Sequence, residues 1–136
     1  MCITKRGDEM IIEIDVSSET PIYTQLVYQI KLGLIQGKIK PGDSLPSVRS
    51  LAGDIGINLH TVNKAYKVLV GEGIVEQVKK GYQISSETPP KISDDYLSVF
   101  KEQLFDLMID AHVFNIDVDH LLEDMQGKLK GDGTDD

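Results

Sequence analysis

The sequence predicts a mainly α-helical protein with a small β-wing, in which an N-terminal winged helix-turn-helix domain precedes a two-helix dimerisation tail. Three patterns support this prediction. Two helical patterns meet at a tight corner at Gly56, a short hairpin pattern follows them, and a proline-containing break precedes two further amphipathic patterns. The expected boundaries are 10–86 for the winged domain, 91–131 for the helical dimerisation region, and 1–9 and 132–136 for flexible termini.

The composition is that of a globular protein and excludes several other classes. Of the 136 residues, 40% are hydrophobic and 26% are charged, which is ordinary for a folded domain. No apolar run approaches the roughly 20 residues of a membrane-spanning helix, and the first ten residues lack the apolar centre of a secretion signal. We therefore expect a cytoplasmic protein with no membrane partner, whose native start is Met1 or Met10. The single cysteine, Cys2, excludes an internal disulfide framework.

The net charge of −8 is distributed unevenly along the chain. Residues 21–86 contain eight basic and four acidic residues, whereas residues 87–136 contain four basic and thirteen acidic ones. A basic segment between acidic ends is expected when one part of a protein binds a polyanion and another part does not. The same asymmetry is compatible with acidic ends that only confer solubility.

The first elements follow from apolar spacing and turn residues. Residues 10–15 predict a short strand, and a helix begins near Pro21, whose missing N–H costs nothing in a first helical turn. This helix contains Gly33 and buries one face, and the turn at 40–43 ends it. The buried face comprises Tyr23, Leu26, Val27, Ile30 and Leu34.

Two helices then form the corner. Ser47 is the expected cap of the first helix, Gly56 ends it in a left-handed conformation, and Asn58 caps the second helix. The first of these helices turns Val48, Leu51, Ala52 and Ile55 inward. The second buries Val62, Ala65, Tyr66, Leu69 and Val70. Its opposite side is polar and basic, with no carboxylate between Asn58 and Val70.

A hairpin and a tail complete the chain. Residues 74–78 and 82–85 predict two strands joined through a basic tip at Lys79, Lys80 and Gly81. After the linker, Ser93 and Asp117 are the expected caps of two amphipathic helices. Their apolar stripes are wider than one small neighbour would cover, so we expect a two-fold dimer interface in preference to packing against the chain's own winged domain. The predicted interface comprises Leu97, Phe100, Leu104, Leu107, Met108, Ala111, Leu121, Leu122 and Met125.

The corner predicts a function for the second of its helices. In a helix-turn-helix this helix enters the major groove of DNA, where polar side chains near its start read base edges. Arg49, His60, Thr61 and Asn63 are the expected base-reading residues, and Asn58 opens the same helix. Lys64, Lys67, Lys79 and Lys80 are the expected phosphate contacts. The predicted partners are therefore a double-stranded DNA operator and a second copy of the chain.

The same residues resemble a known family. The stretches "GKIKPGDSLPSVRSLA", "HTVNKAYKVLVGEGIV" and "KKGYQI" resemble the N-terminal domain of GntR-family transcription regulators, over roughly residues 10 to 85. The strand before "TPIYTQL" and the short tail resemble the YtrA-type branch. The resemblance implies a dimeric bacterial repressor that binds a pseudo-palindromic operator and is released by a signal. It further implies DNA contact by Arg49, by the helix-opening residues Asn58, Leu59, His60 and Thr61, and by the wing glycine Gly81.

The chain departs from the family pattern at two points. Leu59 stands where many members carry a polar residue, which favours an apolar contact such as one with a thymine methyl. The wing is also shorter than the frequent "GKGTFV" type, which disfavours its insertion into the minor groove.

Other functions are less well supported by the sequence. A winged helix that docks proteins remains an alternative, although such domains usually lack a basic recognition face. A metal- or thiol-responsive sensor is a second alternative, but His112 and His120 do not have a recognised ligand spacing, so we expect no metal site and no cofactor. Neither a phosphate-binding glycine loop nor a nucleophile motif is present, so we expect no enzyme. Any small-molecule effector is unidentified and would bind at the dimer interface or between the two parts.

Overall fold

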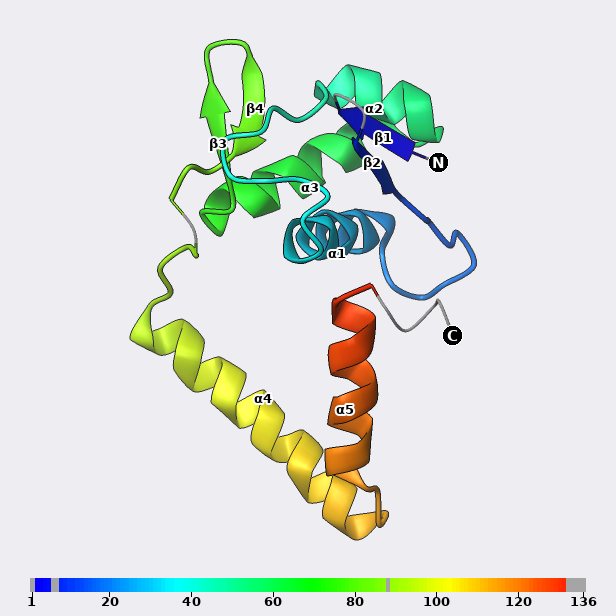
Figure 1. The fold of residues 1–136 in the computed structure, drawn as a ribbon, viewed down its shortest axis with the longest axis vertical. Coiled ribbons are helices and arrows are strands. Elements are labelled where there is room, and N and C mark those ends of the chain that lie inside the picture. The colour runs from blue at the N-terminus through cyan, green and yellow to red at the C-terminus, as the bar shows by residue number, and fades with distance from the viewer. Residues whose placement is uncertain (1, 6–7, 88, 132–136) are drawn as a thin grey trace. The chain divides into compact units, whose positions relative to one another are not determined.

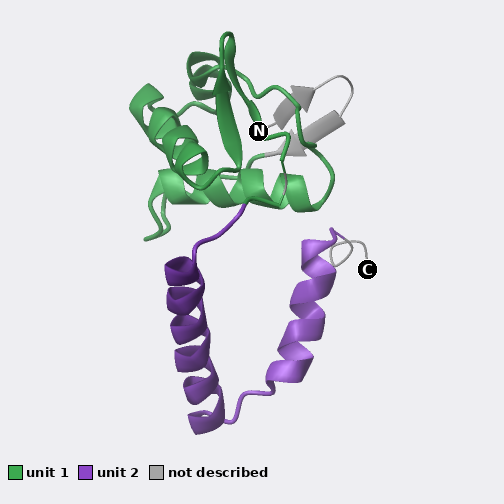
Figure 2. Cartoon of the chain, turned by 90° about the vertical axis from the view of Figure 1, so that its left-hand side faces the viewer, with its two compact units in different colours: residues 1–90 green, residues 91–136 purple. Residues whose placement is uncertain are grey.

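The computed structural model describes residues 2–5, 8–87 and 89–131, which form two compact units, 1–90 and 91–136 (Figure 2). The side chains of residues 2–5 and 8–11 lie outside the description, and with them the thiol of Cys2. The tail at 132–136, expected to be flexible, also lies outside it.

Unit 1 is a bundle of three helices with a hairpin on either side in sequence (Figure 1). Its elements are β1 (Cys2–Lys5), β2 (Asp8–Ile11), α1 (Ile22–Ile35), α2 (Val48–Ile55), α3 (Leu59–Gly71), β3 (Val75–Val78) and β4 (Gly81–Ile84). β1 pairs antiparallel with β2, and β3 pairs antiparallel with β4. The architecture is the predicted winged helix-turn-helix.

The N-terminal strand differs from its predicted position. The sequence predicted one strand over 10–15, but β2 ends at Ile11 and its partner is β1, within the segment 1–9 that was expected to be flexible. Ile12 follows the strand and is almost completely buried in the core. The apolar run at 10–15 therefore contributes a core residue to this unit without remaining a strand throughout.

The core lies between the three helices and the base of the second hairpin. Each helix contributes the side predicted from its apolar spacing, with one exception at the end of α3. The buried residues are Ile12, Leu26, Val27, Ile30, Ile39, Leu45, Leu51, Ala52, Ile55, Val62, Ala65, Tyr66, Leu69, Val75 and Ile84. The exception is Val70, predicted to be buried, whose side chain is 36% exposed because it borders an open hollow beside the wing.

A polar side chain fixes the loop before α1. The carboxamide of Gln25 accepts a 2.8 Å hydrogen bond from the backbone N–H of Asp15 and donates to the carbonyl oxygens of Asp15 and Thr20. Asp15 in turn accepts hydrogen bonds from the hydroxyl and the N–H of Ser17, which lower the pKa of its carboxyl. One glutamine of the first helical turns thus holds the segment that leads into the helix.

The wing has a third segment that the sequence did not indicate. The N–H of Leu45 donates to the carbonyl of Tyr82, the N–H of Gly42 donates to that of Ile84, and Ser44 forms a bridge with Gln83. Residues 42–45, of which only the first two were predicted as the end of the turn at 40–43, therefore pair with β4. Since this segment leads into α2, backbone hydrogen bonds connect the wing to the start of α2.

Unit 2 consists of α4 (Asp94–Val113) and α5 (Val118–Leu129), joined through a short turn (Figure 2). The predicted caps are confirmed: Ser93 accepts a hydrogen bond from the N–H of Tyr96, and Asp117 accepts one from the N–H of His120. Asn115 in the turn has a φ of 57°, a left-handed conformation that asparagine tolerates better than most residues.

Candidate nucleic-acid interface

Two capped helices and a glycine form the corner that carries the candidate interface. Ser47 caps α2 by accepting a 3.0 Å hydrogen bond from the N–H of Ser50, and Gly56 ends the helix at a φ of 71°. Asn58 then caps α3 by accepting a 2.7 Å hydrogen bond from the N–H of His60. All three predicted assignments are confirmed, and they fix where α3 starts. While the Asn58 oxygen caps the helix, its amide N–H groups stay available to a ligand.

The predicted base-reading residues differ in exposure. Arg49 lies exposed in the first turn of α2, and His60 is exposed in the first turn of α3, while Thr61 and Asn63 are half-buried. Leu59 is also half-buried and packs against the core. Part of the leucine side chain is therefore occupied by the domain itself, which limits what it can offer to a thymine methyl.

The cations on α3 point to two sides of the helix. The Lys64 ammonium lies 4.1 Å from the centre of the Tyr23 ring, so this side chain extends toward α1. Lys67 instead lines a hollow beside the wing, together with Asn63. The sequence grouped these residues on one polar face, and the structure divides that face between the α1 side and the wing side.

The surrounding charges leave this face positive. Lys79 and Lys80 are exposed in the two-residue turn between β3 and β4, and Gly81 follows at a φ of 140°, a conformation open to glycine. Glu72, just beyond α3, forms a 2.8 Å salt bridge with Lys31 of α1. Within the described residues, no carboxylate forms a salt bridge with a lysine of α3 or of the hairpin turn, so these cations are available to a polyanion.

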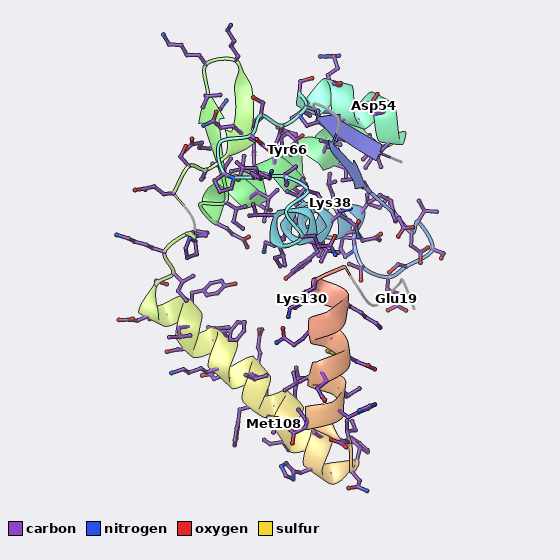
Figure 3. The ribbon with its side chains drawn as sticks, viewed as in Figure 1. Glu19, Lys38, Asp54, Tyr66, Met108 and Lys130 are labelled. Atoms are coloured by element: carbon purple, nitrogen blue, oxygen red, sulfur yellow. The ribbon has the colours of Figure 1, made fainter. Side chains whose placement is uncertain are left out.

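Tyr66 ties the helix, the wing and α2 together. Its ring is completely buried among the elements of unit 1, as predicted (Figure 3). Its hydroxyl donates a 2.8 Å hydrogen bond to the carbonyl oxygen of Pro46, directly before the cap of α2. Its ring meets that of Tyr82 edge-to-face, with centroids 5.0 Å apart. Burial of the phenol raises the pKa of Tyr66, and the neighbouring Tyr82 raises it further. The sequence predicted the burial but gave no indication of these two contacts.

A hollow of about 360 Å³ lies on the surface where α3 and the wing meet. It is lined by Asn63, Lys67, Val70, Gln77 and Tyr82. The sequence assigned no role to Gln77 or Tyr82. Strand alternation was the signal that could have indicated them, because Val75 is buried and Gln77 follows two residues later on the same face of β3.

The predicted dimer residues lie on an unusually apolar surface within unit 2. Seven of the nine have more than a third of their side chain exposed; Met108 is half-buried, and Ala111 is buried within its own chain. The structure adds further exposed apolar side chains that the sequence prediction omitted. These include Phe105, Ile109, Val113, Phe114 and Ile116. Ala111 is the one predicted residue that a partner could not readily reach.

The described residues show neither a candidate metal-binding cluster nor a candidate membrane-spanning helix. The described residues contain no cluster of three or more histidine, cysteine, aspartate or glutamate side chains that could hold a metal ion. Within the same part of the chain, none of the helices combines the length and the apolar character needed to cross a membrane.

Comparison with known proteins identifies the family. Residues 22–81 match the family described as bacterial regulatory proteins, gntR family. Over 130 residues the chain is 42% identical to the HTH-type transcriptional repressor YtrA of Bacillus subtilis (strain 168), covering 90% of this chain and all of that protein. The chain belongs to the GntR family. It is a DNA-binding transcription regulator of the YtrA type, with a GntR winged helix-turn-helix.

Solved structures agree with this GntR assignment. YtrA from Sulfolobus acidocaldarius, a GntR-family transcription factor, is 43% identical with a TM-score of 0.60, covering 71% of this chain and 98% of that one. A transcriptional antiterminator from Listeria monocytogenes EGD-e gives a TM-score of 0.81 at 27% identity, covering 88% and 92%. These relatives do not favour the protein-docking module or the metal or thiol sensor.

Proposed function

We propose that this GntR regulator is a cytoplasmic repressor that binds a pseudo-palindromic operator as a homodimer. The observation that carries the proposal is the carboxylate-free face of α3, held by its cap and by Tyr66 beside the exposed wing cations. The name of the B. subtilis relative, a transcriptional repressor, supports the direction of regulation.

Each side of the interface has its own role in this proposal. Arg49, His60, Thr61 and Asn63 read base edges, assisted by the amide of Asn58 and the exposed part of Leu59. Lys64, Lys67, Lys79 and Lys80 contact phosphates, and Gly81 allows the hairpin to turn next to the duplex. The phosphate contacts supply most of the affinity, and the base contacts set the sequence preference.

The apolar surface of unit 2 supports the proposed homodimer. Phe100, Leu104, Leu121, Leu122 and Met125 are between 39% and 54% exposed, and burial of apolar area at roughly 25 cal/mol per Å² favours association. A two-fold axis through this surface presents two copies of α3 to half-sites roughly 34 Å apart. An effector that releases the repressor would act by changing this dimer.

Selection of bound fragments from random duplex DNA tests the proposal. We expect an enriched inverted repeat whose half-sites are about 10 base pairs apart from centre to centre. Enrichment of a single unrepeated site would contradict the two-fold dimer, and no enrichment would contradict sequence-specific binding.

Salt dependence provides an independent test. If the dimer neutralises about six to eight phosphates, its affinity falls on the order of 10³-fold or more between 50 and 200 mM salt. A flat response in a titration followed by fluorescence anisotropy would show that these lysines do not meet the DNA backbone.

A further inference from the structure

The hollow between α3 and the wing has a defined polar lining. Asn63, Lys67 and Val70 lie one turn apart along a single stripe of α3. From the wing, Gln77 and Tyr82 are direct partners across the β3–β4 pair and so share one face of the hairpin. The hollow is therefore a groove between two elements that lie side by side (Figure 1).

The groove offers hydrogen-bond donors and a positive charge. Lys67 contributes an ammonium group, and the carboxamides of Asn63 and Gln77 can each donate two N–H bonds. Among the described residues no carboxylate lines it, because Glu76 lies on the opposite face of the hairpin, where it accepts a hydrogen bond from Gln83. This donor set suits an anionic oxygen better than an apolar or cationic ligand.

The floor of the groove is held in place by the core. Tyr82 packs edge-to-face on the buried Tyr66, and the carbonyl of Tyr82 accepts the N–H of Leu45. Gln77 is fixed opposite Tyr82 by the hairpin register. Donors on a rigid support lose less conformational entropy on binding than donors on free side chains.

We propose that this groove receives a phosphate of the DNA backbone, which Gln77 and Lys67 contact, while Asn63 beside them keeps the base-reading role proposed above. The proposal rests on the proposed function, because it takes α3 as the helix that enters the major groove. One sugar-phosphate strand of the DNA borders the major groove that α3 enters. In the proposed complex this strand runs between α3 and the wing. A neutral glutamine at that point fixes the register of the duplex without reading its sequence.

Gln77→Ala tests the proposal on two duplexes of about 30 base pairs, one of arbitrary fixed sequence and one obtained by the selection described above. A phosphate contact is independent of sequence, so we expect the affinity for both to fall by about the same factor, on the order of tenfold. Since glutamine carries no charge, the dependence on salt stays unchanged. Lys67→Gln instead lowers the salt slope by about one for each phosphate that the lysine no longer neutralises.

The matched control is Gln83→Ala, the same substitution on the opposite face of the same hairpin. It removes the hydrogen bond with Glu76 and leaves the groove intact, so we expect unchanged DNA affinity. Replacing single phosphates by neutral methylphosphonates adds a second measurement. At one phosphate position per half-site, we expect the methylphosphonate to lower the affinity of the wild type. At the same position it should lower the affinity of Gln77→Ala by little, because the variant has already lost this contact.

The outcomes separate this proposal from the function on which it rests. If Gln77→Ala binds both duplexes as the wild type does while Arg49→Ala and Lys67→Gln bind weakly, the groove is not a phosphate site and the proposed function stands. If only the selected duplex is affected, Gln77 reads a base and the proposal is wrong. If none of these variants changes binding, the α3 face is not the DNA interface and both proposals fail.

Discussion

The hydroxyl of Tyr66 donates a 2.8 Å hydrogen bond to the carbonyl oxygen of Pro46, twenty residues earlier in the chain. The bond joins the buried side of α3 to the residue immediately before the cap of α2. Since Arg49 lies in the first turn of α2 and His60 in the first turn of α3, this contact helps to set the spacing between the two helices at the candidate interface.

Tyr66→Phe removes that hydrogen bond and keeps the buried ring. We expect the free energy of unfolding to fall by about 1 kcal/mol, measured by urea denaturation. Tyr28→Phe is the control, because its ring is 61% exposed, and it should leave stability unchanged. Equal stability of Tyr66→Phe and the wild type would show that water replaces the bond without cost.

The raised pKa of Tyr66 predicts a specific alkaline sensitivity. The folded chain retains the phenolic proton to a higher pH than the unfolded chain, whose tyrosine titrates near 10.0. Stability contributed by the protonated phenol is therefore present below about pH 10 and decreases as the pH rises above it. Unfolding of the wild type should weaken more steeply above this pH than that of Tyr66→Phe. Parallel curves for the two proteins would contradict this assignment.

Gly56→Ala should destabilise the corner. At a φ of 71° an alanine side chain is strained, and the expected loss is about 1 to 2 kcal/mol. Gly53→Ala is a matched control three residues earlier, at an exposed position inside α2 where an added Cβ meets no atom of the described residues within 4 Å. It should stabilise the protein by up to about 1 kcal/mol, since alanine favours a helix more than glycine does. Changes of the same sign at both positions would contradict the left-handed corner.

Arg49→Ala should weaken DNA binding without unfolding the domain. The side chain is exposed, and within the described residues it has no salt bridge, so its loss leaves the core intact. We expect a decrease in affinity for the selected duplex of about tenfold or more, measured by gel-shift titration. The circular dichroism spectrum should stay that of the wild type, and Lys101→Ala on α4 is the control for the removal of a positive charge. If the Arg49→Ala protein were misfolded, the role of this arginine would be to stabilise the fold, and the prediction would be wrong.

Leu104→Asp should disrupt the proposed dimer. Its side chain is 52% exposed on α4, and a carboxylate buried there without a partner costs several kcal/mol. Analytical ultracentrifugation should show the mass shift from two chains to one, with weaker operator binding. Val16→Asp is the control, because Val16 is also apolar and is 81% exposed in unit 1. A dimer that survives Leu104→Asp would place the interface elsewhere.

Local chemistry explains which parts of the fold were predictable. Ser47, Asn58, Ser93 and Asp117 cap their helices because each side-chain oxygen accepts a backbone N–H two or three residues ahead. The left-handed turn at Gly56 has the same local origin. Such interactions depend on a few consecutive residues, so the sequence displays them directly.

Predictions that depended on distant neighbours were less accurate. Val70 has the spacing of a core residue but borders the hollow beside the wing. The pairing of residues 42–45 with β4 depends on a segment about forty residues away. Spacing along a helix shows which residues share a face, but it does not show what that face meets.

The sequence by itself determined the order of the elements from α1 onward, their caps and corner, and the carboxylate-free stretch between Asn58 and Val70, because each is a property of neighbouring residues. Only the tertiary structure decided that Lys64 extends toward α1 while Asn63 and Lys67 face the wing, and that Gln77 joins them. The physical reason is that a groove is formed by surfaces from separate segments. Its lining depends on how α3 and the hairpin pack on Tyr66 and Tyr82, and that packing has no signature in a run of residues.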